Sequence, residues 1–287
     1  MARKPAVAGM FYEADEQDLI QSIEKCFASR LGPGKIPEAA KKRVGNVLGL
    51  VCPHAGYIYS GQAAAHAYSE LAKDGLPDTA VILGPNHHGL GAAVAVGTQD
   101  EWITPFGSMH VDLEIANEIV RLAEFAKADD SAHVREHSIE VQLPFLQYIS
   151  RGHKEIRIVP IAIAYMNKSD ALLLTKDLGD AIAQSVRGKS AVIIASSDLT
   201  HYDSRESARA KDTLALEYVM NLDPEGLIET VYERSITMCG VLPAAVMLHA
   251  CNALGATGAR KLAYYSSGDV TGETDQVVGY GALSIEA

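Results

Sequence analysis

Residues 47–57 read VLGLVCPHAGY, and this stretch indicates the class of fold. Its first six residues, Val47–Cys52, form an apolar run of strand length that ends abruptly at Pro53 and His54. Nearly continuous apolar strands are typical of sheets that are covered on both faces. Runs of the same kind, rich in Val and Ile, recur at Ala80–Leu83, Ala92–Val96, Ile156–Ile163 and Ala191–Ala195, with a last pair at Lys261–Tyr265 and Val277–Ile285.

Helical patterns alternate with these apolar runs. Apolar residues between Leu174 and Val186 recur at helical spacing, and Ser169 stands before them as the expected N-cap. The same spacing predicts helices at Gly61–Leu71, Asp112–Leu122, Ser138–Ile149, Ala210–Met220 and Val241–Leu254. This alternation predicts an α/β protein with a central, largely parallel or mixed sheet between layers of helices.

The length of 287 residues is compatible with one large α/β domain, and we expect a single domain over residues 1–287. A chain of this size buries enough apolar surface to fold without disulfides or a structural metal. The segment SRLGPGKIPEAAKKR, residues 29–43, has the composition of a loop. Too little sequence precedes it to form a domain, so we interpret it as a connector.

The charge of the chain argues against two classes of partner. With 25 basic and 36 acidic residues, the net charge is −11. Nucleic acids and anionic membranes both select basic patches, so we expect neither as a partner. No apolar run approaches the ~20 residues that span a bilayer, and the N-terminus turns polar too early for a signal peptide. We therefore expect a cytoplasmic protein whose four cysteines are reduced.

Three of the predicted strands are followed by a histidine. His54 follows Val47–Cys52, His87 follows the second strand in GPNHHG, and His201 follows Ala191–Ala195 in SSDLTHY. In open α/β sheets, ligands bind beyond the carboxyl ends of the strands. If these strands are neighbours, the three histidines converge on one cleft, where imidazole suits both metal binding and proton transfer.

Two further motifs supply candidate residues for this cleft. In EHSIE, Glu136 and Glu140 are four residues apart and would share one face of a helix, which Pro144 would kink or shorten. This motif is compatible with His137 and a carboxylate in the site, and equally with a solvated acidic helix start. Cys239 lies close to the expected start of Val241–Leu254, where a helix N-terminus favours the thiolate.

Other polar residues near the strand ends have weaker support. Asp198 either orients a histidine, binds metal or caps a turn. His88 is expected to support the site rather than bind metal, because neighbouring side chains on a short loop point in different directions. Cys52 is a weaker candidate than Cys239, since its side chain is placed to enter the core. The remaining histidines have no supporting context: His66, His110, His133, His153 and His249.

Five motifs resemble, in this order, those of the MEMO family: PHAGY at 53–57, GPNHH at 84–88, EHSIE at 136–140, SDLTH at 197–201 and Cys239-Gly240. The opening AGMFY at 8–12 and the closing GYGAL at 279–283 fit as well, so the resemblance covers nearly the whole chain. The family is related in fold to the class III extradiol non-haem-iron dioxygenases. The resemblance therefore implies a three-layer α/β/α sandwich.

The resemblance also implies roles for individual residues. It makes His54, His87 and Cys239 the metal ligands. It places His201 at the acid/base histidine of the dioxygenases, with Asp198 and His137 along the same cleft. A cysteine in place of the third, carboxylate ligand shifts the expected metal from Fe(II) alone toward Fe(II) or Cu, with Zn as an alternative.

Three functions stay open at this point. The first is a metal-dependent oxidoreductase resembling the dioxygenases, and the second is a module that binds metal or peptide without turnover. The third is a zinc hydrolase with an open water position. The expected partner is a small-molecule or peptide ligand in the cleft. For microbial members, the resemblance implies an AMMECR1-like protein and a radical-SAM protein as functional partners.

Overall fold

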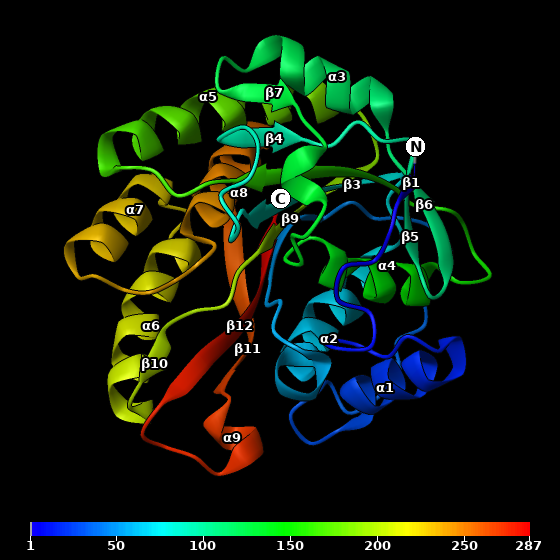
Figure 1. Cartoon of the computed structure of the whole chain (residues 1–287), viewed down its shortest axis with the longest axis vertical. Coiled ribbons are helices and arrows are strands. Elements are labelled where there is room, and N and C mark those ends of the chain that lie inside the picture. Colours follow the sequence, from blue (N-terminus) through cyan, green and yellow to red (C-terminus); the bar gives the residue numbers. More distant parts are fainter. Residues whose placement is uncertain (1) are drawn as a thin grey trace.

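A computed structural model describes residues 2–287, and its centre is a nine-stranded sheet (Figure 1). The strands follow the order β10-β12-β2-β9-β3-β8-β4-β7, and β11 pairs with β12. Their bounds are β2 Val47–Cys52, β3 Thr79–Pro85, β4 Val94–Val96, β7 Ala126–Ala128, β8 Arg157–Ile163, β9 Ala191–Ser196, β10 His201–Asp203, β11 Gly258–Ser266 and β12 Val277–Glu286. The four central strands β2, β9, β3 and β8 are parallel, while β12 and β4 join them antiparallel.

Helices cover both faces of this sheet, which makes a three-layer α/β/α arrangement (Figure 1). One layer contains α3 Leu113–Leu122, α5 Lys168–Val186, α6 Arg205–Met220, α7 Pro224–Glu233 and α8 Val241–Leu254. The other contains α1 Glu16–Ala28, α2 Tyr57–Asp74 and α4 Leu143–Ser150. A short helix, α9 Gly268–Thr271, packs on β11. The predicted fold class is thus confirmed.

A second, three-stranded sheet lies beside the main one. It is formed by β1 Ala2–Arg3, β5 Glu101–Thr104 and β6 Gly107–His110. The strand β1 pairs parallel with β5, so the N-terminus of the described chain is tied to a segment nearly 100 residues away. Neither β1, β5 nor β6 was expected from the sequence, since all three are too short to show a clear period.

The central strands and helix α8 agree closely with the sequence. The predicted strand Val47–Cys52 and the predicted helix Val241–Leu254 have the observed bounds. Helix α8 is apolar on nearly all sides because it lies against β2, β3 and β9 and is covered by α5 and α7. The segment 29–43 contains neither helix nor strand, as expected for a connector. Single-domain organisation stays a prediction.

Two local predictions are wrong. Residues Ser138–Ile149 do not form one helix: a 3₁₀ turn covers Glu140–Gln142 and α4 begins only at Leu143. Pro144 lies in the first turn of α4, where its missing N–H costs no hydrogen bond. Glu136 and Glu140 therefore share no helix face. Helix α5 is capped by Asn167, not Ser169, because the Asn167 side chain accepts a hydrogen bond from the backbone of Asp170.

Within residues 2–287, no helix is both long and apolar enough to cross a membrane. This finding agrees with the absence of a long apolar run in the sequence.

The third parallel strand approaches the loop that follows Glu136 closely, and this contact can be tested. A Cβ added at Gly84 in β3 would lie 2.4 Å from Ser138 Oγ and 2.9 Å from Ile139 Cγ1. We expect Gly84→Ala to lower the free energy of unfolding in urea by about 1–3 kcal/mol through overpacking. Gly258→Ala is the control, since a Cβ there meets nothing within 4 Å. Equal stability of the two variants would contradict the proposed contact.

Candidate metal centre

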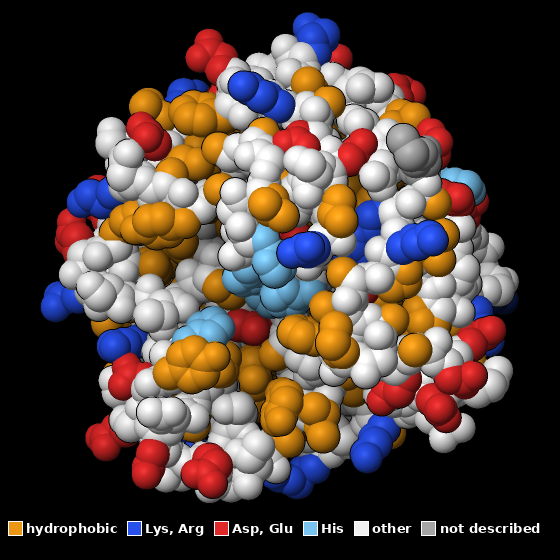
Figure 2. Space-filling model, viewed as in Figure 1, with side chains coloured by type: hydrophobic (Ala, Val, Ile, Leu, Met, Phe, Trp, Pro, Cys, Tyr) orange, Lys and Arg blue, Asp and Glu red, His pale blue; other side chains and the backbone are white. Residues whose placement is uncertain are grey.

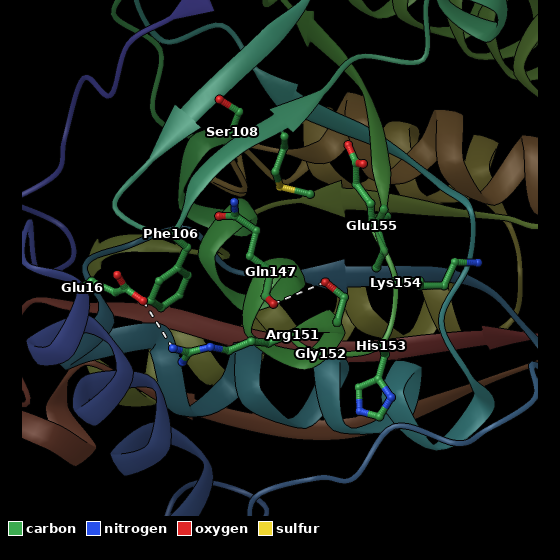
Figure 3. A pocket seen from close by; sticks show the side chains of 12 residues that line it. Glu16, Phe106, Ser108, Gln147, Arg151, Gly152, His153, Lys154 and Glu155 are labelled. Carbon is green, nitrogen blue, oxygen red and sulfur yellow. Dashed lines mark hydrogen bonds and ion pairs between the residues drawn. The ribbon is translucent and has the colours of Figure 1, made fainter.

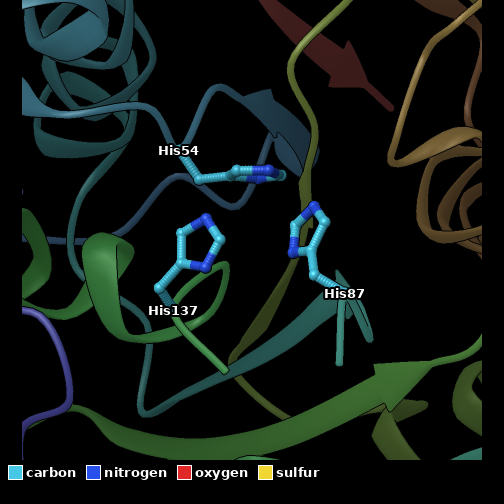
Figure 4. A group of neighbouring side chains, drawn as sticks. All are labelled: His54, His87 and His137. Carbon is cyan, nitrogen blue, oxygen red and sulfur yellow. The ribbon is translucent and has the colours of Figure 1, made fainter. Parts of the chain in front are cut away.

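Three imidazoles meet beyond the carboxyl end of the sheet (Figure 4). His54 follows β2, His87 follows β3, and His137 comes from the loop between β7 and α4. One ring nitrogen of each lies within 4.8 Å of the others, and the ring centroids are 4.8–5.5 Å apart. Because β2, β9 and β3 are adjacent and parallel, His54 and His87 meet at one edge of the sheet as expected, but the third imidazole of this group is His137 and not the predicted His201.

The histidines are accessible from one face of the molecule. Figure 2 shows His side chains gathered in a hollow at the centre of this face, with hydrophobic side chains around it. His54 is buried at the bottom, whereas 31% of the His87 side chain is exposed. A ligand can therefore approach the group from the side of His87.

Glu136 orients the His87 imidazole and binds the backbone of the loop that carries His137. Its carboxylate is fully buried and accepts hydrogen bonds from His87 Nδ1 at 2.9 Å and from the backbone N–H groups of His87, His137 and Ser138 at 2.6–2.9 Å. Burial raises the pKa of this carboxyl, but the hydrogen bond and charge of His87 outweigh it and hold the pKa well below its usual range. Glu136 is therefore an ionised acceptor.

This ionised partner fixes the tautomer of His87. A carboxylate only accepts, so Nδ1 of His87 carries the proton and donates it to Glu136. The lone pair of His87 is consequently on Nε2. Metal-binding histidines are commonly oriented in this way by a carboxylate on the other ring nitrogen.

Ser196, at the end of β9, fixes the tautomer of His54. The Ser196 hydroxyl lies 2.6 Å from the Ser138 carbonyl, which can only accept, so its single proton is used there. The Ser196 hydroxyl oxygen must therefore accept a hydrogen bond from His54 Nδ1, which lies 2.9 Å away. Gln142 Nε2 also donates to this hydroxyl, at 2.8 Å. The lone pair of His54 is therefore on Nε2, which faces the cleft.

Cys239 touches the group from the opposite side. Its Sγ lies 3.3 Å from His54 Nε2 and 3.6 Å from the Asp198 carbonyl oxygen. Among the described residues, the groups of three close donors include His137 and not Cys239. The prediction of a thiolate at Cys239 is wrong for the metal-free protein. Burial, and after it the charge of Asp198, raise the pKa of Cys239. This increase exceeds the lowering of the pKa that the nearby helix N-terminus would cause.

Asp198 braces the loop that carries His54. It is buried, and Oδ1 accepts a hydrogen bond from the backbone N–H of His54 at 2.9 Å. Its Oδ2 lies 4.0 Å from His54 Nε2. Burial raises the pKa of Asp198. This carboxyl thus orients the His54 segment rather than capping a helix.

His201 lies at the edge of the cleft, in β10. Its Nδ1 is 2.9 Å from the Thr237 carbonyl oxygen, and its backbone N–H donates to Thr237 Oγ1 at 2.7 Å. Because a carbonyl only accepts, Nδ1 carries the proton and Nε2 is free. Thr237 is two residues before Cys239, so these contacts join the His201 and Cys239 segments.

Several residues that support the site were not singled out from the sequence. In the sequence, Ser196 and Gln142 look like ordinary polar residues, and only their contacts reveal their role. Ser138 contacts the Ser196 hydroxyl through its backbone carbonyl. His88, which was expected to support the site rather than bind metal, is exposed and forms a second group of three close donors with Glu136 and His137. No signal in the sequence separates these roles.

Another pocket, of about 400 Å³, is separate from the histidine cleft and contains a single histidine, His153 (Figure 3). It is lined by residues 150–156, which immediately precede β8, and therefore sits near the amino end of the parallel strands. An ion pair between Arg151 and Glu16 crosses it. Nothing in this pocket resembles the donor set of the histidine cleft, so the cleft is the better candidate site.

The fold and the cleft define an α/β protein with a histidine cluster at the carboxyl edge of its sheet. The family model described as Memo-like protein matches residues 3–284, so the chain belongs to the Memo-like family. A MEMO1 family protein of Methanopyrus kandleri is 45% identical over 285 residues, covering 99% of this chain and 98% of its own. One of Methanobrevibacter smithii is 44% identical over 283 residues, covering 98% of each chain. The resemblance noted in the motifs is confirmed.

The low pKa of His137 leads to a pH prediction for the metal-free protein. Burial, and repulsion from His87, lower this pKa to about 4, although Glu136 opposes the shift. Between pH 6.5 and 4, the unfolded chain therefore binds more protons than the native protein. The stability that follows from the neutral His137 is fully present above pH 6.5 and is lost as the pH falls toward 4.

We expect the wild type to lose about 2–3 kcal/mol more stability than His137→Gln between pH 7 and pH 4.5, because the unfolded chain protonates this imidazole in that range while the native protein keeps it largely neutral. Urea unfolding of both proteins, after chelation, measures the difference. Glu136, with its low pKa, takes up no proton in this window. Parallel pH profiles for the two proteins would contradict the assigned shift.

Proposed function

We propose that this protein binds a redox-active metal ion, Fe(II) or Cu, through His54, His87 and Cys239, and acts as a metal-dependent oxidoreductase. The observation that carries the proposal is the pair of fixed tautomers: Nδ1 of His54 and of His87 each donates to an acceptor, which leaves both Nε2 lone pairs in the cleft. Two preset imidazoles with buried partners are what a metal site requires.

The donor set fits these metals. Imidazole suits Fe, Cu and Zn, and a thiolate favours the softer or redox-active ones. Cys239 Sγ lies 3.3 Å from His54 Nε2, and Cys239 lines the same cavity as His87. His137 is the alternative third donor, since its ring already lies close to both other imidazoles. When bound, such a metal supplies electron transfer to or from a substrate.

The remaining residues of the cleft have roles of their own in this proposal. His201, with Nδ1 held by the Thr237 carbonyl, accepts a proton on Nε2 and serves as general base. Asp198 holds the His54 backbone in place. His137 lies between Phe11, at 4.7 Å between ring centroids, and His87, and limits access from that side. We also propose a cytoplasmic location, in keeping with the four free cysteines.

The first test is the metal content of protein purified without oxygen. We expect close to one Fe or Cu per chain in the wild type, and at least a tenfold lower content in His54→Ala and His87→Ala, because each loses a ligand. Mass spectrometry of the metals gives the content, and circular dichroism checks folding. His153→Ala, which removes a histidine near the amino end of the sheet, is the matched control. Metal retained in both cleft variants would overturn the proposal.

The third ligand is tested with Co²⁺ as a spectroscopic probe. We expect wild type and His137→Gln to show thiolate-to-cobalt charge-transfer absorption, and Cys239→Ser to lack it, since only a bound thiolate gives this band. If His137 were the third ligand, the band would be absent from the wild type, while cobalt would still bind.

A further inference from the structure

A cavity of about 550 Å³ opens beside the histidine cleft. Both His87 and Cys239 line it. Its other walls come from the end of β8 and from Tyr165 two residues later, from the last turn of α7, and from the segment that leads into α8. Small-molecule sites have volumes in this range and use a few polar groups at one end of an apolar wall.

Two tyrosines form the aromatic wall of this cavity. The rings of Tyr165 and Tyr232 are stacked, with centroids 5.7 Å apart and planes at 12°. The Tyr232 hydroxyl donates to the Met166 carbonyl at 2.7 Å, so its polar end is satisfied within the protein. Tyr165 is 80% exposed, although nothing in the fold needs an aromatic ring at such a position. The pair thus offers a flat apolar surface to a ligand.

Charge is missing from the cavity walls. Among the described residues that line it, none is Lys, Arg, Asp or Glu. Its polar side chains are partly engaged already: Asn86 holds the Leu90 carbonyl and the Gly89 N–H, and Thr237 binds His201. A phosphate or sulfate group would find no cation there, whereas the donor end at His87 and Cys239 suits one oxygen or nitrogen atom.

We propose that this cavity binds an uncharged aromatic small molecule, with its ring against Tyr165 and Tyr232 and its single polar atom directed at His87 and Cys239. This inference rests on the proposed function, for which it names the class of substrate. The proposal excludes sugar phosphates, nucleotides and phosphorylated peptides as ligands, because they carry charges that the cavity walls do not neutralise.

The test uses 2-naphthol as the probe and 2-naphthyl phosphate as its charged counterpart, measured by calorimetry on full-length protein treated with a chelator. About 1 M salt shortens the range of charge effects to about 3 Å, so repulsion by the acidic protein as a whole is screened. We expect one saturable site for 2-naphthol, with affinity at least tenfold higher than for the phosphate. Absent saturation, or equal affinities, would overturn the proposal.

A pair of matched variants locates the site. We expect Tyr165→Ser to weaken 2-naphthol binding about three- to tenfold, as loss of an aromatic contact does. Tyr202→Ser is the control: Tyr202 is 76% exposed and lies by His201, but it does not line the cavity. Both rings are exposed, so neither variant removes core packing. A larger loss in Tyr202→Ser than in Tyr165→Ser would place the ligand elsewhere and refute the inference.

This experiment fails independently of the metal proposal. It is done without metal, so 2-naphthol binding does not depend on occupancy of the histidine site. A protein that holds stoichiometric metal but does not bind 2-naphthol keeps the proposed function and loses the substrate class. A protein that binds 2-naphthol but retains no metal keeps the aromatic site and loses the redox role.

Discussion

The hydrogen bonds of the Glu136 carboxylate are the constraint on which the site depends. This charge is fully buried, and an unpaired buried carboxylate is costly. It is stabilised by donors from two segments about 50 residues apart: His87 after β3, and the backbone that follows Glu136 itself. Removing any donor leaves the charge less compensated, so the two segments hold one fixed arrangement. The His87 ring orientation is a direct consequence, because its Nδ1 is part of the same set of bonds.

A second buried carboxylate, Glu140, extends this constraint to the N-terminus. It pairs with the Arg3 guanidinium and accepts from the Tyr12 hydroxyl at 2.6 Å and from two backbone N–H groups of the N-terminal segment. Arg3 also donates to the Glu136 carbonyl at 2.6 Å and lies over the Trp102 ring. Breaking such a pair leaves a buried charge without a partner, which typically costs 3–5 kcal/mol. The loop between β7 and α4 is thus held firmly without regular secondary structure.

Glu136 and Glu140 also mark the part of the structure that could not be predicted from the sequence. The apolar runs predicted the central strands, and the rule for open sheets brought His54 and His87 to one edge, because both depend on local composition and on parallel order. The motif at 136–140 has helical spacing, yet it forms no helix, since both acids turn inward to donors remote in the sequence. Arg3 is 137 residues from Glu140. Such pairings leave no periodic signal, so the role of this loop could not be derived from spacing.

Two opposing effects act on the protonation of the Cys239 thiol. Helix α8 begins two residues later, which favours a thiolate, but burial and the Asp198 charge favour the neutral thiol, and they prevail. Burial and the other histidines likewise keep His54 neutral by lowering its pKa. In the proposed ligand set, His54 therefore binds without losing a proton, while the Cys239 thiol must release one. Metal binding by this proposed set would then be coupled to deprotonation of Cys239, so its affinity would rise with pH. In the proposed site, a bound cation would supply the charge that stabilises the Cys239 thiolate, which burial and Asp198 disfavour in the metal-free protein.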